Sequence, residues 1–329
     1  MVSIKTVAVL GVRKSNTTQS VMESVLHIAN VHEQGSGNLG PAVITELVSA
    51  GFSVTGVTRE GSTNSTPKFP DSLPVKKVDY SSFDALKDAF HGQDAVVSVV
   101  GAPGIAAQKT AIDAALAAGV KRFIPSEFGI HTRKVRGTSI GKILAGKIAI
   151  VDYLEEKVKE NPEFTWTGLS TGLFFDWGLD FSGLGTVNLN DKTATVIDSG
   201  NEKFYASNLA HIGRAVAGIL KHPDETANKY LATASFNLSQ NELIALVEEL
   251  TGSKLPVTKL KSADLQKAGE EKLAAGDPRA FVDFLRAHNS ADGAGNALTE
   301  DESANKLIGV PYEDLKASVE SWLRRKSVL

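Results

Sequence analysis

The sequence predicts an α/β protein: a doubly wound parallel sheet with a smaller mixed α/β region in the second half of the chain. Short apolar runs alternate with helix-like segments throughout the first half. The run at residues 95–100 is apolar at almost every position, which is typical of a central strand covered on both faces. The run at residues 5–11 ends in Gly11, as a strand does where it enters a phosphate-binding turn.

The expected elements follow from these patterns in chain order. In the first half we expect strands at 5–11, 52–58, 74–78, 95–100 and 122–125, and helices at 41–48, 82–90 and 108–118. In the second half we expect strands at 165–169, 193–197 and 229–232, and helices at 208–220, 239–251, 262–274, 278–286 and 312–323. We therefore predict an NAD(P)-binding region at residues 1–160 and a substrate-binding region at residues 161–329 that completes the sheet and forms a small α/β domain.

Composition narrows the function. The 329 residues carry 35 basic and 38 acidic side chains, and no basic stripe points to nucleic acid. The absence of cysteine excludes disulfides and thiolate chemistry, and the seven histidines show no metal-binding spacing. No apolar run is long enough to span a bilayer. We expect a cytoplasmic protein with a small-molecule partner, no metal, and no nucleic-acid or membrane contact; the oligomeric state is left open.

A glycine-rich segment follows the first strand at an unusual distance. Gly35, Ser36, Gly37, Asn38, Leu39 and Gly40 run into the helix expected at 41–48. Joined to Gly11, this segment completes a dinucleotide-binding unit of strand, glycine turn, helix and second strand. Glycine permits the tight turn and the close approach of the pyrophosphate, and the helix N-terminus offers free N–H groups. We predict that Gly11 and residues 35–40 bind the cofactor.

Residues 12–34 interrupt this unit. Such connections commonly span 2–6 residues. Met22, Val25, Leu26 and Ala29 have helical spacing, so one hypothesis is a lid or partner-contact element over the phosphate site. The other is the translation of an unspliced intron, which we favour because the flanking halves join into a continuous motif. If the segment is present, we expect it to loop out and to weaken cofactor binding.

Cofactor choice depends on the end of the second strand. Arg59 lies 19 positions after Gly40, near the place where an NAD enzyme carries an acid. A guanidinium there suits a 2′-phosphate, so we predict NADPH rather than NADH. An inward-turned Glu60 would favour NAD instead. The ends of later strands add Val100, Gly101 and Ser126 to the predicted cofactor contacts.

The chain resembles the NmrA-like and isoflavone-reductase-like family of atypical short-chain dehydrogenases. The most specific match is Gly-Val-Lys-Arg-Phe-Ile-Pro-Ser-Glu-Phe-Gly at residues 119–129, supported by residues 94–98 and by the helix that contains Lys147. The resemblance implies a Rossmann domain and NADPH-dependent reduction of small, often phenolic, molecules. Some relatives instead bind the nucleotide as redox-sensing regulators.

Lys147 is the predicted catalytic residue. Val151, Leu154 and Val158 follow it at offsets of 4, 7 and 11, which places it on the apolar face of its helix. The resemblance implies that this lysine contacts the nicotinamide ribose or the substrate and assists proton transfer. Lys142 is the alternative. The Tyr-x-x-x-Lys pair of ordinary short-chain dehydrogenases is absent, because position 143 is isoleucine.

Several further side chains complete the predicted site. Phe128 could pack on the nicotinamide, and His131 could donate a proton. Phe174, Asp176 and Trp177 are predicted to line the substrate pocket together with His131. Residues 137–141 match a hydrolase nucleophile elbow, but no apolar strand precedes them, so we reject that function. We predict an NADPH-dependent reductase of a small aromatic or phenolic substrate; the competing hypothesis is a nucleotide-sensing regulator that binds a protein partner.

Overall fold

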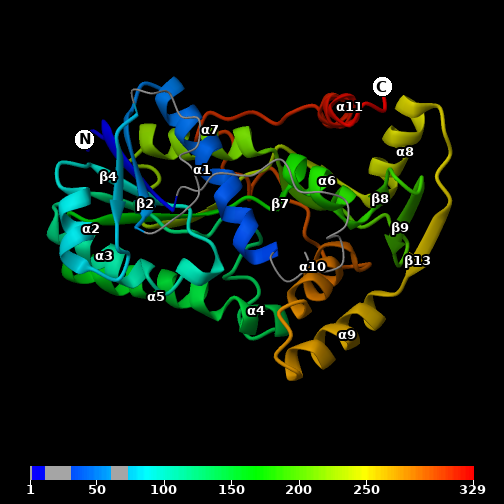
Figure 1. The fold of residues 1–329 in the computed structure, drawn as a ribbon, viewed down its shortest axis with the longest axis horizontal. Helices are drawn as coiled ribbons and strands as arrows, with labels where there is room; N and C mark the ends of the chain where they lie inside the picture. The colour runs from blue at the N-terminus through cyan, green and yellow to red at the C-terminus, as the bar shows by residue number, and fades with distance from the viewer. Residues whose placement is uncertain (1, 12–30, 61–72) are drawn as a thin grey trace.

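The computed structural model describes residues 2–11, 31–60 and 73–329. Within these residues the centre of the fold is a seven-stranded parallel sheet with the order β11-β6-β5-β4-β1-β2-β3 (Figure 1). Its strands are β1 (Thr6–Leu10), β2 (Ser53–Arg59), β3 (Val75–Val78), β4 (Ala95–Ser98), β5 (Arg122–Ile124), β6 (Thr165–Ser170) and β11 (Lys229–Ala232). The sheet confirms the predicted fold class, and the strands lie where the apolar runs predicted them.

The order of the strands reverses between β1 and β4. From β1 the chain continues to β2 and β3 on one side, and then returns to β4, β5 and β6 on the other. Leu10 pairs with Val57 of β2 and with Ser98 of β4, so the carboxyl ends of these strands meet at one edge. Doubly wound sheets bind their ligands in the crevice at such a reversal. The ligand site is therefore expected beyond Leu10 and Ser98.

Helices cover both faces of the sheet because successive side chains of its strands point in opposite directions. Val7 and Val9 of β1 pack under α1 (Val31–Ser49) and α7 (Leu209–Lys221). Ala8 and Leu10 belong to the core on the other face. That face is covered by α2 (Phe83–Phe90), α3 (Gln108–Ala117) and α5 (Ala145–Glu160), which lie together on one side in Figure 1. The unbroken apolar sequence of the central strands follows from this double coverage.

The glycine segment is not a turn in this structure. We predicted a turn over residues 35–40 and a helix from Pro41, but α1 is already helical from Val31 and places Pro41 in its interior. That prediction of local structure is wrong. A turn at the glycines requires the end of β1 to lie directly before them, and residues 12–34 remove that connection. The helix predicted within residues 12–34 falls largely outside the described residues.

The second half of the chain completes the large sheet and adds two small ones. β6 and β11 extend the sheet at one edge, while the division of the chain near residue 160 stays a prediction. The first small sheet has the order β12-β10-β7 and the second has the order β13-β9-β8. Their strands are β7 (Leu173–Phe174), β8 (Val187–Asn188), β9 (Thr193–Ile197), β10 (Phe204–Ser207), β12 (Phe236–Leu238) and β13 (Val257–Leu260).

Four further helices lie close to the predicted positions: α8 (Gln240–Thr251), α9 (Ser262–Ala274), α10 (Ala280–Ser290) and α11 (Leu315–Arg325). Two short helices, α4 (Ser139–Ile143) and α6 (Phe175–Ser182), were not predicted from the sequence. Short 3₁₀ turns, η3 (Ala102–Gly104) and η4 (Gly183–Gly185), follow β4 and α6. Across the described part of the chain, every helix is too short or too polar to cross a membrane.

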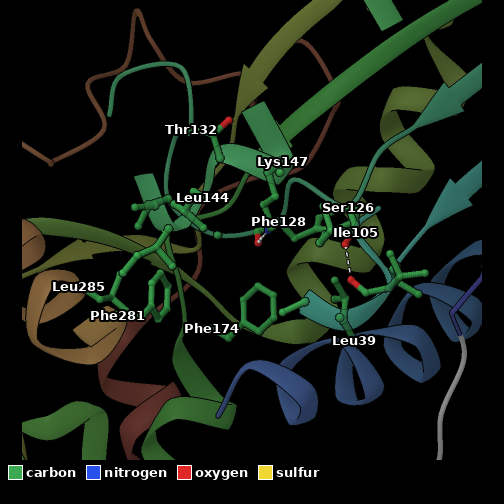
Figure 2. A pocket seen from close by; sticks show the side chains of 18 of the residues that line it. Leu39, Ile105, Ser126, Phe128, Thr132, Leu144, Lys147, Phe174, Phe281 and Leu285 are labelled. Atoms are coloured by element: carbon green, nitrogen blue, oxygen red, sulfur yellow. Dashed lines mark hydrogen bonds between the residues drawn. The ribbon is translucent and has the colours of Figure 1, made fainter. Parts of the chain in front are cut away.

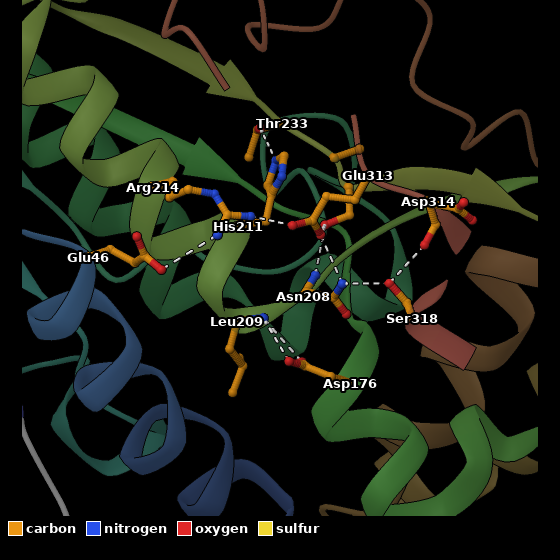
Figure 3. Close-up of polar contacts among 12 residues, drawn as sticks. Glu46, Asp176, Asn208, Leu209, His211, Arg214, Thr233, Glu313, Asp314 and Ser318 are labelled. Carbon is orange, nitrogen blue, oxygen red and sulfur yellow. Dashed lines mark hydrogen bonds and ion pairs between the residues drawn. The ribbon is translucent and has the colours of Figure 1, made fainter. Parts of the chain in front are cut away.

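A polar cluster joins α7 to α1 and to the segment before α11 (Figure 3). Arg214 forms ion pairs with Glu46 at 3.5 Å and with Glu313. Glu313 also accepts hydrogen bonds from the Ser235 hydroxyl at 2.6 Å and from the Asn208 amide at 2.9 Å. One side chain of α7 thereby ties together three segments that are distant in sequence.

Acidification is expected to destabilise the fold through His211, which lies fully buried beside this cluster. Its Nε2 lies 2.9 Å from the Thr233 hydroxyl, and burial lowers the pKa of His211 to about 4. On acidification, His211 of the unfolded chain binds a proton near pH 6.5, whereas in the folded protein it stays neutral until the pH approaches 4. Stability is therefore present above pH 6.5 and is lost as pH falls towards 4, by about 2–3 kcal/mol for this residue.

Denaturant unfolding of wild type and His211→Gln between pH 7 and pH 4 measures this effect. The variant should show a flatter pH dependence than wild type. His91→Gln, at an exposed position after α2, is the control and should retain the wild-type slope. Equal slopes for His211→Gln and wild type would contradict the assignment.

Candidate active site

A cavity of about 320 Å³ opens at the carboxyl edge of the sheet (Figure 2). Its walls come from the segments that follow β4, β5 and β6, and from α1, α4, α5, α6 and α10. Most of its lining is apolar or aromatic. The residues are Leu39, Val99, Val100, Gly101, Ala102, Ile105, Ser126, Phe128, Gly129, Ile130, Thr132, Ile143, Leu144, Gly146, Lys147, Gly172, Leu173, Phe174, Trp177, Phe281 and Leu285.

Lys147 supplies the positive charge of this pocket. It lies in the first turn of α5, while Val151 and Leu154 on the same helix are buried in the core. Its Nζ donates a hydrogen bond to the carbonyl oxygen of Phe128 at 3.2 Å. Burial lowers the pKa of Lys147, and the charge of Glu127 acts in the opposite direction. Lys142, the alternative lysine, is exposed on α4 and does not line the pocket.

Ser126 connects the ends of β4 and β5 beside the pocket. Its hydroxyl donates to the Val100 carbonyl at 2.7 Å, and its backbone N–H donates to the Gln108 side chain at 2.8 Å. Figure 2 shows the hydroxyl directed towards the segment after β4. The hydroxyl proton of Ser126 is therefore already engaged in a hydrogen bond, and the hydroxyl oxygen can still accept one from a ligand.

Gly11 allows the chain to leave β1 at the strand reversal. Its φ is +98°, a conformation that favours glycine, and a Cβ at this position would lie 2.8 Å from the Val100 nitrogen. Its N–H donates to the Val57 carbonyl at 3.1 Å. Leu39 of α1 and Gly101 line the pocket at the same edge, and Arg59 is exposed at the end of β2. These residues form a glycine-containing edge of the kind that accommodates a dinucleotide.

Two predicted pocket residues lie elsewhere. His131 does not line the pocket; its ring stacks on Tyr230, with 4.3 Å between the ring centroids. The chain turns at Gly129, whose φ is +131°. The side chain of His131 is therefore half-buried against the ring of Tyr230. Burial and the neighbouring Lys134 lower the pKa of His131 to about 4, so it is neutral at pH 7 and is a poor proton donor.

Asp176 also lies outside the pocket lining. Its carboxylate accepts hydrogen bonds from the backbone N–H groups of Trp177 at 2.9 Å and Leu209 at 3.1 Å. The second contact places the carboxylate at the N-terminus of α7, where free N–H groups and the helix dipole favour a negative charge. Its neighbours Phe174 and Trp177 do line the pocket, and their contact with a substrate stays a prediction.

The sequence did not reveal the outer wall of the pocket. Phe281 and Leu285 are one turn apart on α10, so both face the same direction, and Figure 2 shows them beside Leu144. Their apolar spacing was visible in the sequence, but which element they would contact was not. Ile143, at the position of the missing tyrosine, is also part of the lining.

Across residues 2–11, 31–60 and 73–329, no group of three or more histidine, aspartate or glutamate side chains is placed to hold a metal ion. The polar groups of the pocket are instead one ammonium and a small number of hydroxyls.

A parallel sheet whose strand order reverses, with a pocket at the point of reversal, is the arrangement of nucleotide-dependent α/β enzymes. The NmrA-like family matches this chain over residues 34–275, and the chain belongs to that family. Oxidoreductase poxI of Penicillium oxalicum is 35% identical over 283 residues, which cover 85% of this chain and 89% of that protein. The protein is accordingly an oxidoreductase, as predicted.

Two further proteins extend the comparison. Isoflavone reductase homolog P3 of Arabidopsis thaliana is 29% identical over 250 residues, covering 72% of this chain and 79% of that protein. The solved structure of AtPrR2 with NADP+ and (+)pinoresinol superposes with a TM-score of 0.73 at 20% identity, over 98% of this chain and 99% of that one. The first supports the predicted isoflavone-reductase-like resemblance, and the second supports the fold.

Proposed function

We propose that this protein is an NADPH-dependent reductase that transfers hydride to a small aromatic or phenolic molecule. The observation that carries the proposal is the position of Lys147, whose ammonium lies in an apolar, aromatic-lined cavity at the strand reversal of a doubly wound sheet. The oxidoreductase relative and the neighbouring structure that holds NADP+ support the same reaction class.

The residues at the carboxyl edge suit a dinucleotide. The positive φ of Gly11 and its close approach to Val100 leave backbone, rather than side chains, at the end of β1. Gly101, Ser126 and Phe128 would hold the nicotinamide end, and Leu39 lies beside them in the lining. When bound, NADPH supplies the hydride.

The chemistry of the chain itself follows from the pocket. Aromatic side chains on several walls, including Phe128, Phe174 and Trp177, favour a flat apolar substrate. The Lys147 ammonium would donate a hydrogen bond to a substrate oxygen and stabilise the negative charge that develops there. Because the lining of the cavity is mostly apolar, this charge acts more strongly than it would in solution. Lys147 then delivers the proton that balances the transferred hydride.

The proposal is tested by nucleotide titration followed by a turnover screen. The purified 329-residue protein is titrated with NADPH and NADH, and NADPH oxidation is then measured with phenylpropanoid- and isoflavone-like compounds. NADPH-selective binding with turnover of a phenolic compound is the expected result. Binding without turnover of any compound would favour a nucleotide-sensing regulator that acts through a protein partner.

Replacing Arg59 by alanine is expected to weaken NADPH binding about tenfold while changing NADH binding little. The exposed guanidinium at the end of β2 would contact the 2′-phosphate, which only NADPH carries. Fluorescence titration of both nucleotides measures the ratio. Arg324→Ala removes an exposed guanidinium from α11 and should leave both affinities unchanged. An equal loss for NADPH and NADH would exclude Arg59 from cofactor selection.

A further inference from the structure

A buried carboxylate lies directly behind the pocket wall. Glu127 is only 1% exposed and stands between two lining residues, Ser126 and Phe128. Its Oε2 accepts hydrogen bonds from the hydroxyls of Thr132 and of Tyr230, the latter at 2.8 Å. Thr132 itself lines the pocket. The carboxylate is thus connected to the pocket by a hydroxyl on one side and adjoins two of its wall residues in the chain.

Burying a carboxylate is costly unless hydrogen bonds and an opposite charge compensate it. The two hydroxyls provide the hydrogen bonds, and Lys147 provides the charge. Burial raises the pKa of Glu127, whereas Lys147 and the two hydroxyls lower it. The effect is reciprocal, because burial lowers the pKa of Lys147 and Glu127 raises it. Lys147 Nζ donates a hydrogen bond to the carbonyl of Phe128, the residue that directly follows Glu127 in the chain.

The other titratable and charged groups near this pair are His131, Tyr230, Arg133 and Lys134. The pKa of His131, stacked on Tyr230, is lowered to about 4 by burial, so this ring is neutral at pH 7. Burial and Glu127 raise the pKa of Tyr230 well above its ordinary value, so its hydroxyl keeps its proton. Arg133 and Lys134 are exposed and form ion pairs with Glu155 and Glu302. Burial favours the neutral form of both Glu127 and Lys147, and the charge of each acts against this effect on the pKa of the other.

We propose that Glu127 is the positioning residue of the site: its carboxylate, held behind the pocket wall by the hydroxyls of Thr132 and Tyr230, attracts the ammonium of Lys147 and so stabilises it at that wall. This inference rests on the proposed role of Lys147 as proton donor. In this role Glu127 influences the protonation state of Lys147 and does not itself contact the substrate. The proton donor is then a charged pair, of which only one member reaches the cavity.

The decisive variant is Glu127→Gln. Both hydroxyls donate to the same oxygen, so the amide oxygen can accept both hydrogen bonds while the negative charge is removed. The pKa of Lys147 should then fall by about one unit or more. The basic limb of the kcat/KM profile should move to lower pH by the same amount, and the NADPH dissociation constant should stay within about twofold of wild type.

A second measurement reads Lys147 without turnover. The protein is treated with acetic anhydride over a range of pH, and acetylation of the Lys147 peptide is followed by mass spectrometry. Only the neutral amine reacts, so the midpoint reports its pKa. We expect the midpoint to be highest in wild type, lower in Glu127→Asp and lowest in Glu127→Gln. Aspartate keeps the negative charge, but its side chain is one methylene shorter, so the charge lies farther from Lys147. The aspartate variant keeps the test available if the glutamine variant does not fold.

Glu155→Gln is the matched control. Glu155 is on α5 with Lys147, eight residues and about 12 Å along the helix, and it pairs with Arg133 at the surface. Solvent and salt screen a charge at that distance, so the Lys147 midpoint should not move. An unshifted midpoint in Glu127→Gln, with or without lower stability, overturns the proposal. A shifted midpoint in a protein that reduces no aromatic compound upholds the pairing and overturns the proposed function instead.

Discussion

Replacing Lys147 by alanine is expected to lower kcat about 10³-fold while leaving the NADPH dissociation constant within about threefold of wild type. The variant removes the ammonium that the structure places in an apolar cavity, 3.2 Å from the Phe128 carbonyl. A positioned acid contributes mainly to the transition state, where negative charge develops on the substrate, so the loss should fall on kcat. NADPH oxidation with the phenolic substrate and a parallel nucleotide titration measure the two quantities.

Lys142→Ala provides the matched control for this prediction. It removes a lysine only five residues away, but one that is exposed on α4 and outside the cavity, so turnover should be unchanged. The loss in Lys147→Ala should also be greatest at low pH, where the wild-type ammonium is fully charged. The two activities should converge as pH rises through the lowered pKa of Lys147. Undiminished turnover in Lys147→Ala would remove this residue from the mechanism.

The sequence predicted the parts of the fold that local pattern determines. The alternation of buried runs and helix-like segments located the strands of the large sheet, most clearly β1 and β4, because a strand covered on both faces is largely apolar. The apolar offsets after Lys147 oriented α5 towards the sheet, and the aromatic run after β6 supplied Phe174 and Trp177 to the pocket. Each of these features depends on residues close together in the chain.

The predictions that failed depend on contacts between distant segments. Asp176 is directed to the N-terminus of α7 by the N–H group of Leu209, which lies more than thirty residues later. His131 is held by the ring of Tyr230, a contact across nearly a hundred residues. Tyr230, which lies on β11, also supplies one of the two hydroxyls that donate hydrogen bonds to Glu127. Polar side chains near a strand end have several possible partners, and only the tertiary arrangement selects among them.

The glycine segment at residues 35–40 has the composition of a phosphate-binding turn but lies within a helix. Joined directly, Gly11 and residues 35–40 make a complete phosphate-binding turn, yet in the 329-residue chain these glycines belong to α1. Glycine disfavours a helix interior by about 1 kcal/mol relative to alanine. Pro41 within α1 cannot donate the usual backbone hydrogen bond. The segment is therefore better suited to a turn than to the helix that it occupies.

Deleting residues 12–34 is accordingly expected to tighten NADPH binding about tenfold or more. In the shortened chain Gly11 leads directly into Gly35, so the glycines can turn at the end of β1 and the helix can begin near Pro41, a residue favoured at the first helical position. The free N–H groups of that helix would then face the pyrophosphate. Nucleotide titration of both chains, with circular dichroism to confirm that each is folded, measures the change.

Gly37→Ala, made in both chains, distinguishes a reassembled turn from a general gain in stability. In the shortened chain the added methyl group should reverse most of the gain in affinity, because the turn and the close approach of phosphate both need glycine. In the full-length chain Gly37 lies within α1, where alanine is the better helix former, so the same replacement should leave NADPH binding unchanged and should not lower stability. Equal effects in the two chains would mean that residues 35–40 play the same part in both. The displacement of the glycines would then have no bearing on the affinity, and residues 12–34 could not be regarded as an interruption of the cofactor site.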